Sequence, residues 1–596
     1  NNYQGGNVEG AWKNLKPIQD EMFSRLDNNF SGINVNGILG NESGCGAYQS
    51  LGDIYFDFDG EARTENPKNY VRELDLDDGF VRVSYENKGV QFTREYMASY
   101  PGNVMAFRLT SSKEDALSFK LDYNQGDGRT AIIDKAEENA IVYQGKVNAG
   151  GMAFATKLKV VAPDADVTCN SDATISVSNG EDVLILMSAG TNYDITESKN
   201  INNISDFYTA DGDYLDNDDP NGNIVMSEVT ARVNDAAEKG YAELVKAHME
   251  DYQGIRGRVG LEVGDGEKAA MTTDDLLDEY KKERSNYAET VLFQMGRYLL
   301  LSSSRDSLPA NLQGIWNDSN SPGWNSDYHF NVNLQMNYWP AFVTDMSETA
   351  MPLVNYMDSL RNPGNVTARE HFGVEDGWVV NTEANPFGKT APGSAFSWGF
   401  TPGSGAWTCQ NLWDYYEFTG DPEVLEKIYP ILKEGAEFWL GYMVEDPRTR
   451  TEGVEGTGEL VTAPGGSSEH GPVGVGTTYD MSLAYMEMQN TAKAAKILGV
   501  DEGLQTQIQG ALSRMKPFWI GTDGQLKEWR EETGYSSMPG TEKLHRHLSH
   551  LLGLHPGNLI TKEGGEFSEY YDAAVRALEL RDDGSSAVGW SMAQKG

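Results

Sequence analysis

The sequence predicts a multidomain protein of mixed α and β class, with a large N-terminal β-sandwich, a helical linker and a helical domain shaped as an α/α toroid. Three observations lead to this prediction. Short alternating runs fill the first 230 residues, charged helical patterns follow to about residue 286, and amphipathic helices separated by Gly-rich loops fill the remainder. At 596 residues the chain is long enough to form several hydrophobic cores.

Residues 1–230 are predicted to form the β-sandwich domain. In residues 81–86 the side chains of Val81, Val83 and Tyr85 alternate with polar ones, which is the pattern of a strand with one buried face. Similar runs recur at 54–58 and 104–109, and Asp-Gly, Asn-Gly and Lys-Gly pairs predict turns between the runs. Many short strands without helices between them are typical of antiparallel sandwiches.

Residues 231–286 predict a helical linker, and residues 287–596 predict the helical domain. The first helix of that domain is expected to bury a stripe of apolar side chains formed by Tyr287, Val291, Leu292, Met295, Tyr298 and Leu299. Asp421 and Pro422 predict the start of another helix, and Pro430 is expected to kink or end it. A third stripe begins at Met481, and Gly499 is expected to cap its helix.

The charge balance excludes several classes of partner. The chain has 48 basic and 90 acidic residues, so its formal net charge is −42. Phosphate backbones and anionic lipids would be repelled, and we expect neither nucleic-acid binding nor membrane insertion. No stretch of 18 apolar residues predicts a membrane-spanning helix. The three cysteines are far apart in the sequence and predict neither a disulfide framework nor a zinc site. No cofactor signature is present, and we expect no cofactor.

Three segments carry residues suited to chemistry. Residues 304–339 are rich in amides and aromatic rings, and His329, Asn331 and Asn333 would share one face if the backbone there is extended. Such amides can bind sugar hydroxyls, or they can satisfy the backbone of a buried loop. Glu469 lies in a loop bounded by Gly and Pro and is a candidate general acid, although this segment taken alone favours a surface Glu that caps a nearby helix.

The third segment, residues 545–555, holds four of the eight histidines. It contains no interleaved carboxylate and no His-Glu-x-x-His pattern, so histidines and an arginine that line a polar pocket fit better than a metal cluster. Residues 528–529 and 589–591 are expected either to form walls of this pocket or simply to pack.

Together these segments resemble glycoside hydrolase family 95, which comprises 1,2-α-L-fucosidases and some α-L-galactosidases. The resemblance runs from the Tyr-Gln-Ser-Leu-Gly-Asp motif at 48–53, through the blocks at 308–339, 468–472 and 545–551, to Gly-Trp-Ser at 589–591. These blocks stand in the family's order over most of the chain. The resemblance implies an N-terminal β-supersandwich, a helical linker and an (α/α)6 barrel that carries the site.

The resemblance also implies an inverting hydrolysis of terminal α-1,2-linked L-fucose in glycans. Glu469 corresponds to the general acid, and Asn331 and Asn333 correspond to the pair that holds the attacking water. The positions that line the family's sugar pocket are His329, Trp407, Arg546 and His547, with Glu383 as a further candidate. The family has Pro where this chain has Ser468, which leaves the carboxyl group in place.

The family's activating Asp is expected beyond Gly596, and further β structure is expected before Asn1. We therefore expect the chain to be truncated at both ends relative to the family, with an incomplete barrel. The nature of the substrate suggests an extracellular, cell-surface or periplasmic location in a bacterium.

Three alternatives remain open at the level of sequence. The first is an α-L-galactosidase of the same family, and here a bulky His329 near C6 of the sugar favours fucose. The second is a glycan-binding relative with impaired catalysis. The third is a polysaccharide lyase on a similar toroid, which the acidic composition disfavours.

Overall fold

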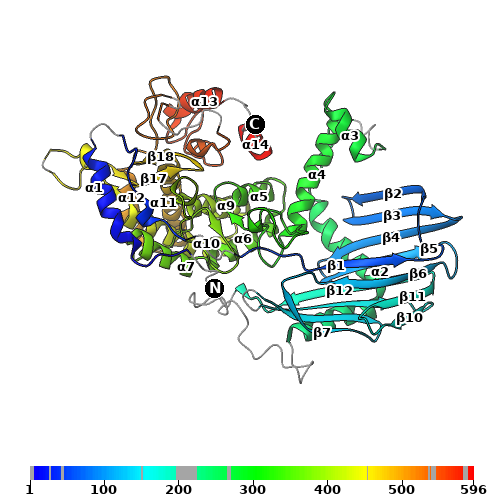
Figure 1. Ribbon diagram of the computed structural model, residues 1–596. Coiled ribbons are helices and arrows are strands. Elements are labelled where there is room, and N and C mark those ends of the chain that lie inside the picture. The colour runs from blue at the N-terminus through cyan, green and yellow to red at the C-terminus, as the bar shows by residue number, and fades with distance from the viewer. Residues whose placement is uncertain are drawn as a thin grey trace.

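A computed structural model of the chain describes residues 6–25, 29–41, 46–148, 152–195, 224–264, 270–452, 454–534, 537–538, 545–581 and 588–596. Figure 1 shows the long β-strands gathered at one end of the molecule and most of the helices at the other, with α4 between them and α2 behind the strands. The predicted fold class, a multidomain chain with an N-terminal β-sandwich followed by helices, is confirmed.

The β domain consists of two antiparallel sheets. The four-stranded sheet has the order β1 (Asp53–Phe58), β6 (Leu117–Asn124), β11 (Ile175–Gly180) and β10 (Asp166–Cys169). The eight-stranded sheet has the order β2 (Lys68–Asp75), β3 (Phe80–Asn87), β4 (Val90–Ser99), β5 (Val104–Ser111), β12 (Asp182–Thr191), β9 (Ala153–Val161), β8 (Ala140–Val147) and β7 (Arg129–Glu137). Their facing side chains form one core, to which Phe119 contributes from the smaller sheet and Phe92 and Ile185 from the larger.

Helix α2 (Ile224–Arg256) covers the outer face of the eight-stranded sheet. Val233, Ala236 and Leu244 pack there against residues such as Leu184 and Leu186 of β12. The helix is interrupted at Gly240, whose φ of 78° is not helical. The segment predicted as a linker thus contributes to the core of the β domain. The boundaries proposed at residues 230 and 286 stay predictions.

The stripe predicted for α4 (Asn286–Ser303) is wrong. Leu292 is 73% exposed and Leu299 is 37% exposed, whereas Arg297 is buried. The Arg297 guanidinium donates hydrogen bonds to backbone carbonyls, among them that of Arg256 at 2.8 Å and that of Val259 at 2.7 Å. The face of α4 that carries Arg297 is therefore the one that packs against the end of α2. Carbonyl groups at the end of a helix have no partner within it, and here they accept hydrogen bonds from Arg297.

The helical domain packs its helices in neighbouring pairs, among them α10 with α11, α9 with α11 and α5 with α9. Its helices are α5 (Asn333–Val343), α6 (Met351–Ser359), α7 (Arg361–Thr367), α8 (Phe396–Gly399), α9 (Gly403–Thr419), α10 (Pro422–Tyr442), α11 (Thr478–Leu498), α12 (Glu502–Leu512), α13 (Tyr571–Leu580) and α14 (Gly589–Lys595), and α3 (Thr273–Tyr280) precedes α4. No helix of the described part of the chain is both long and apolar enough to cross a membrane.

The predicted start of α10 and end of α11 are confirmed. The Asp421 side chain accepts a hydrogen bond from the Glu423 backbone at 2.9 Å, with Pro422 in the first turn. Gly499 ends α11 with a φ of 70°. Pro430, however, does not end α10, which continues to Tyr442. The packing of Ile431, Phe438 and Trp439 in the core stabilises the helix beyond the proline.

The first described residues belong to the helical end of the molecule, whereas the sequence assigned them to the β domain. In α1 (Leu15–Ser24), Leu15, Ile18 and Met22 pack into the core that also contains α10 and α11. The Val8 amide donates to His371 Nε2 at 3.0 Å. Apolar surface on α1 is thus covered by distant helices, a contact that local sequence patterns do not contain.

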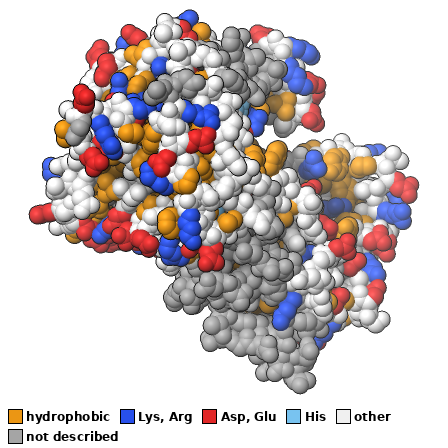
Figure 2. All heavy atoms as spheres, turned by 60° about the vertical axis from the view of Figure 1, so that its left-hand side comes forward, with side chains coloured by type: hydrophobic (Ala, Val, Ile, Leu, Met, Phe, Trp, Pro, Cys, Tyr) orange, Lys and Arg blue, Asp and Glu red, His pale blue; other side chains and the backbone are white. Residues whose placement is uncertain are grey.

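Acidic and basic side chains are interleaved on the face of the molecule shown in Figure 2, with apolar groups between them. Oppositely charged side chains thus lie close together on this face, although the chain as a whole has a formal net charge of −42.

Glu487 of α11 makes folding sensitive to pH. It is 3% exposed and accepts a hydrogen bond from Trp439 Nε1 at 2.7 Å. Burial raises its pKa from 4.5 to about 7, against the opposing effect of hydrogen bonds from Cys409 and Trp439. In this window the folded state holds a proton that the unfolded chain releases. The free energy of unfolding therefore falls as pH rises from about 4.5 to about 7.

We expect Glu487→Gln to reduce the loss of stability between about pH 5 and about pH 8 by about 2 kcal/mol, because the amide does not ionise. Urea unfolding at the two pH values measures this difference. Glu502→Gln, in the exposed first turn of α12, is the control and should keep the wild-type slope. An unchanged slope in Glu487→Gln would contradict the assigned pKa.

Candidate active site

Glu469 lies at the tip of a tight hairpin between β17 (Gly465–Ser467) and β18 (His470–Gly474). Ser467 pairs with His470, so only Ser468 and Glu469 form the turn. Glu469 has a φ of 63°, a left-handed backbone conformation that residues other than Gly rarely adopt. The residue is therefore held in an uncommon conformation, and its side chain is 20% exposed.

The hairpin is fixed from behind by Trp529. Gly471 has a φ of 79°, and a Cβ atom there would lie 2.1 Å from Trp529 Cζ2. The indole Nε1 donates to the Pro472 carbonyl at 3.0 Å. Only glycine at position 471 allows the indole ring to approach this closely. The residues that follow Glu469 therefore let Trp529 pack against the hairpin.

Three side chains from distant segments converge on the Glu469 carboxylate. Asn331 Nδ2 donates to Oε1 at 2.7 Å, Arg546 forms an ion pair with Oε2, and His547 Nε2 lies 3.1 Å from Oε2. Burial by itself would raise the pKa of Glu469, but His547, Arg546 and Asn331 together outweigh it and hold the pKa well below its ordinary value. Without a ligand, Glu469 is thus a carboxylate.

Asn331 follows the short strand β13 (Tyr328–His329), and Asn333 is the first residue of α5. The prediction that His329, Asn331 and Asn333 share an extended face is wrong, because the strand ends at His329 and the helix begins at Asn333. Asn331 is fully buried, and its Oδ1 has no hydrogen-bond partner among the described residues. This oxygen is available to a ligand or to a water molecule.

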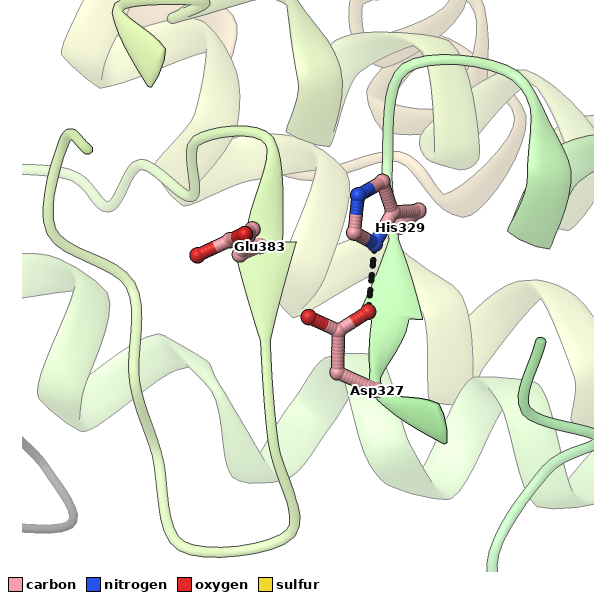
Figure 3. A group of neighbouring side chains, drawn as sticks. All are labelled: Asp327, His329 and Glu383. Atoms are coloured by element: carbon pink, nitrogen blue, oxygen red, sulfur yellow. Dashed lines mark hydrogen bonds and ion pairs between the residues drawn. The ribbon is translucent and has the colours of Figure 1, made fainter. Parts of the chain in front are cut away.

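His329 belongs to a group of ionisable side chains beside the hairpin. Its Nδ1 is hydrogen-bonded to Asp327, and it pairs across the strands with Glu383 of β14 (Glu383–Ala384), as Figure 3 shows. Burial would lower the pKa of His329, but Asp327, with contributions from Glu383 and Glu469, raises it. Ligand atoms of Asp327, His329 and Glu383 lie within 4.8 Å of one another, as a metal site would require.

The charges of this group are already balanced within the chain. Lys389 Nζ donates to Glu383 Oε2 at 2.6 Å, and the raised pKa of His329 favours its positive form. The Lys389 ammonium thus faces the Glu383 carboxylate, and the His329 ring faces the Asp327 carboxyl group. The arrangement fits a rigid polar wall, to which Glu383 contributes one carboxylate, and a role of Glu383 in sugar binding stays a prediction.

The predicted histidine pocket takes the form of stacked rings. His545 stacks on His470 with ring centres 3.8 Å apart, and His547 lies between His545 and Trp590, at 5.3 Å and 4.8 Å. Burial lowers the pKa of His545 to about 2. The His545 ring is thus neutral near pH 7, and the stack lies beside the Glu469 carboxylate, which His547 Nε2 approaches to 3.1 Å.

Not every predicted residue reaches this carboxylate. Trp407 of α9 is buried and lies edge-on to Tyr479, with ring centres 6.4 Å apart. Among the hydrogen bonds between described residues, none joins Trp407 or Asn333 to Glu469. Their roles at the site stay predictions. Glu528 and Trp529, whose role the sequence left open, contact the hairpin, and Arg581, which no sequence motif marked, pairs with Glu528.

Two family models match the chain. Residues 240–596 match the glycosyl hydrolase family 95 catalytic domain, and residues 1–196 match the glycosyl hydrolase family 65 N-terminal domain. A solved structure described as a kojibiose phosphorylase from the human microbiome has a TM-score of 0.55 at 10% identity, over 81% of this chain and 62% of that chain. This likeness concerns the fold alone and agrees with a β-sandwich followed by an (α/α)6 barrel.

Two relatives extend the match along the whole chain. An Aspergillus niger protein named probable alpha-fucosidase A is 32% identical over 99% of this chain and 72% of its own length. An Arabidopsis thaliana protein named alpha-L-fucosidase 2 is 30% identical over 92% of this chain, which spans 65% of that relative's length. The predicted resemblance and the prediction of a glycoside hydrolase are confirmed, and the chain belongs to glycosyl hydrolase family 95.

Proposed function

We propose that this chain removes terminal α-1,2-linked L-fucose from glycans with inversion of the anomeric configuration. Glu469 acts as general acid, Asn331 and Asn333 hold the attacking water, and His329, Trp407, Arg546 and His547 line the sugar pocket. The names of the relatives support fucose as the sugar. The observation that carries the proposal is the convergence of Asn331, Arg546 and His547 on the Glu469 carboxylate.

The contacts of Glu469 must change when substrate binds. An inverting enzyme needs room for the sugar and a water molecule between its acid and the opposite side of the site. The Asn331–Glu469 contact of 2.7 Å leaves no such room, so the sugar must separate the two side chains. Once Arg546 and Asn331 turn to the sugar hydroxyls, Glu469 loses two of the three groups that lower its pKa and keeps only His547, whose own pKa is lowered by burial. Burial then favours its protonated form, which a general acid requires.

The reaction then proceeds in one displacement. Glu469 transfers its proton to the glycosidic oxygen as the bond from that oxygen to C1 of fucose breaks. Water attacks C1 from the opposite face and gives β-L-fucose. Asn331 Oδ1 accepts a hydrogen bond from this water. An amide is not a base, so the water's proton passes to a carboxylate, which acts as the general base opposite Glu469.

His329 is the proposed wall at C6 of the sugar. Its side chain is 12% exposed and is held by Asp327, so it has little freedom to move away. L-galactose carries an extra hydroxyl on C6, and this rigid wall favours L-fucose over it.

Proton NMR during incubation with 2′-fucosyllactose tests the function. We expect free fucose whose first detectable anomer is β, and a higher rate on nitrophenyl α-L-fucoside than on nitrophenyl α-L-galactoside. Release of the α anomer first would contradict inversion. A preference for the galactoside would contradict the assigned sugar, and binding of the trisaccharide without turnover would identify a glycan-binding relative.

A further inference from the structure

Glu528 contacts the acid-bearing hairpin on both sides of Glu469. This carboxylate is 4% exposed and comes from the loop after α12. Its Oε1 accepts hydrogen bonds from Ser467 Oγ, two residues before Glu469, and from His470 Nε2, one residue after it, at 2.8 Å. One oxygen atom thus fixes both ends of the turn that presents Glu469.

Arg581 holds the segment that carries Arg546, just as Glu528 holds the hairpin. Its guanidinium is 2% exposed, and Nη1 donates to the backbone carbonyls of His545 at 3.1 Å and His547 at 2.8 Å. These two carbonyls flank Arg546. The cation therefore holds the backbone from which Arg546 and His547 reach the Glu469 carboxylate.

The two groups are joined by a buried ion pair. Arg581 Nη2 donates to Glu528 Oε2 at 2.8 Å, so each oxygen of Glu528 has a partner. Burial would raise the pKa of Glu528, but the charges of His470 and Arg581 hold it well below its ordinary value. The stacking of His545 on His470 connects the same two segments a second time, at 3.8 Å between ring centres.

We propose that Glu528 and Arg581 are positioning residues that set the separation of Glu469 from Arg546 and His547, and through it the general-acid step. This inference rests on the proposed role of Glu469. Neither residue touches the sugar in this scheme. Their effect is exerted through the backbone of the hairpin and of residues 545–547. A rigid buried connection suits this task, since small misplacement of a catalytic group costs a large factor in rate.

A comparison of leaving groups separates positioning of the acid from general support of the fold. Fucose release from 2′-fucosyllactose needs a proton on the leaving oxygen, whereas release of fluoride from α-L-fucosyl fluoride does not. We expect Glu528→Gln to lower kcat on the trisaccharide about 100-fold and to leave kcat on the fluoride within about threefold of wild type. Glu469→Gln, measured beside it, should show the same selectivity.

Glu532→Gln is the matched control. Glu532 is also buried, and its Oε1 accepts hydrogen bonds at 2.8 Å from the Glu528 backbone amide and from Gln525. It supports the same loop without a hydrogen bond to the hairpin among the described residues. Both rates of this variant should stay within about threefold of wild type, because the acid keeps its place.

Equal losses on both substrates, or no loss on either, in Glu528→Gln would overturn the inference. If that variant does not fold, Ser467→Ala replaces it, because it removes one hydrogen bond to Glu528 and leaves the ion pair intact. Ser467→Ala is then expected to lose about tenfold on the trisaccharide alone, and an equal loss on the fluoride would overturn the inference. Full activity of Glu469→Gln on the trisaccharide would instead refute the role of Glu469 and thus the proposed function.

Discussion

Glu469→Gln is expected to lower the rate of fucose release from 2′-fucosyllactose by about 10³-fold, since an amide cannot deliver a proton to the glycosidic oxygen. The amide has nearly the same shape, and it can still accept the hydrogen bond that Asn331 Nδ2 donates to Oε1. It loses the charge that pairs with Arg546, at a side chain of which 20% is exposed. Folding should therefore be preserved while catalysis is lost. Initial rates by NMR and the midpoint of thermal unfolding measure the two effects separately.

Glu566→Gln is a suitable control for this variant. Glu566 accepts a hydrogen bond from Gln489 Nε2 at 2.8 Å on the surface of α11 and also contacts Tyr485, away from the hairpin. Its rate should remain within about twofold of wild type. Glu469→Gln activity within tenfold of wild type would assign the acid to another residue.

Asn331→Ala is expected to lower kcat by about 10²- to 10³-fold, the usual cost of losing one preorganised hydrogen-bonding group at a reacting centre. The residue is fully buried, and its Oδ1 has no partner among the residues described. Such an unpaired oxygen is costly in a folded protein unless a ligand or water uses it. Its removal should therefore harm catalysis much more than folding, as kcat and thermal unfolding can show.

Asn337→Ala separates the catalytic amide from a structural one. Asn337 Nδ2, from the same helix α5, donates to the Ala310 carbonyl at 3.4 Å and to the Asn311 carbonyl at 3.3 Å. We expect this variant to lose stability and to keep most of its kcat. The double variant Glu469→Gln/Asn331→Ala should be hardly slower than Glu469→Gln, because groups that act as a unit are not additive. Multiplicative losses would show that the two residues act independently.

The sequence predicted those features that depend on neighbouring residues. Asp421 accepts a hydrogen bond from the first turn of its helix, and Pro422 fits that turn, whatever the rest of the fold. Gly499 ends α11 because glycine adopts a φ of 70° at little cost. The alternation at residues 81–86 likewise gave strand β3 (Phe80–Asn87), with Val83 and Tyr85 in the sandwich core. Local rules were sufficient for these elements.

Local rules failed where a distant segment decided which face is buried. Leu292 of α4 is exposed because Arg297 of the same helix turns to the end of α2. Pro430 stays inside α10, since the core contacts beyond it hold the helix together. The apolar face of α1 is covered by the helical domain and not by the strands that follow it in the sequence.

The residues of the site came from the resemblance to the family, in which Glu469 and Asn331 occupy matching positions. The sequence by itself determined the chemical groups and the class of fold. Only the tertiary structure decided that Asn331, Arg546 and His547 meet at Glu469, and that Glu528 and Arg581 hold them there. The reason is physical: Arg581 follows Glu469 by more than a hundred residues, and only the packing of the whole helical domain brings them together.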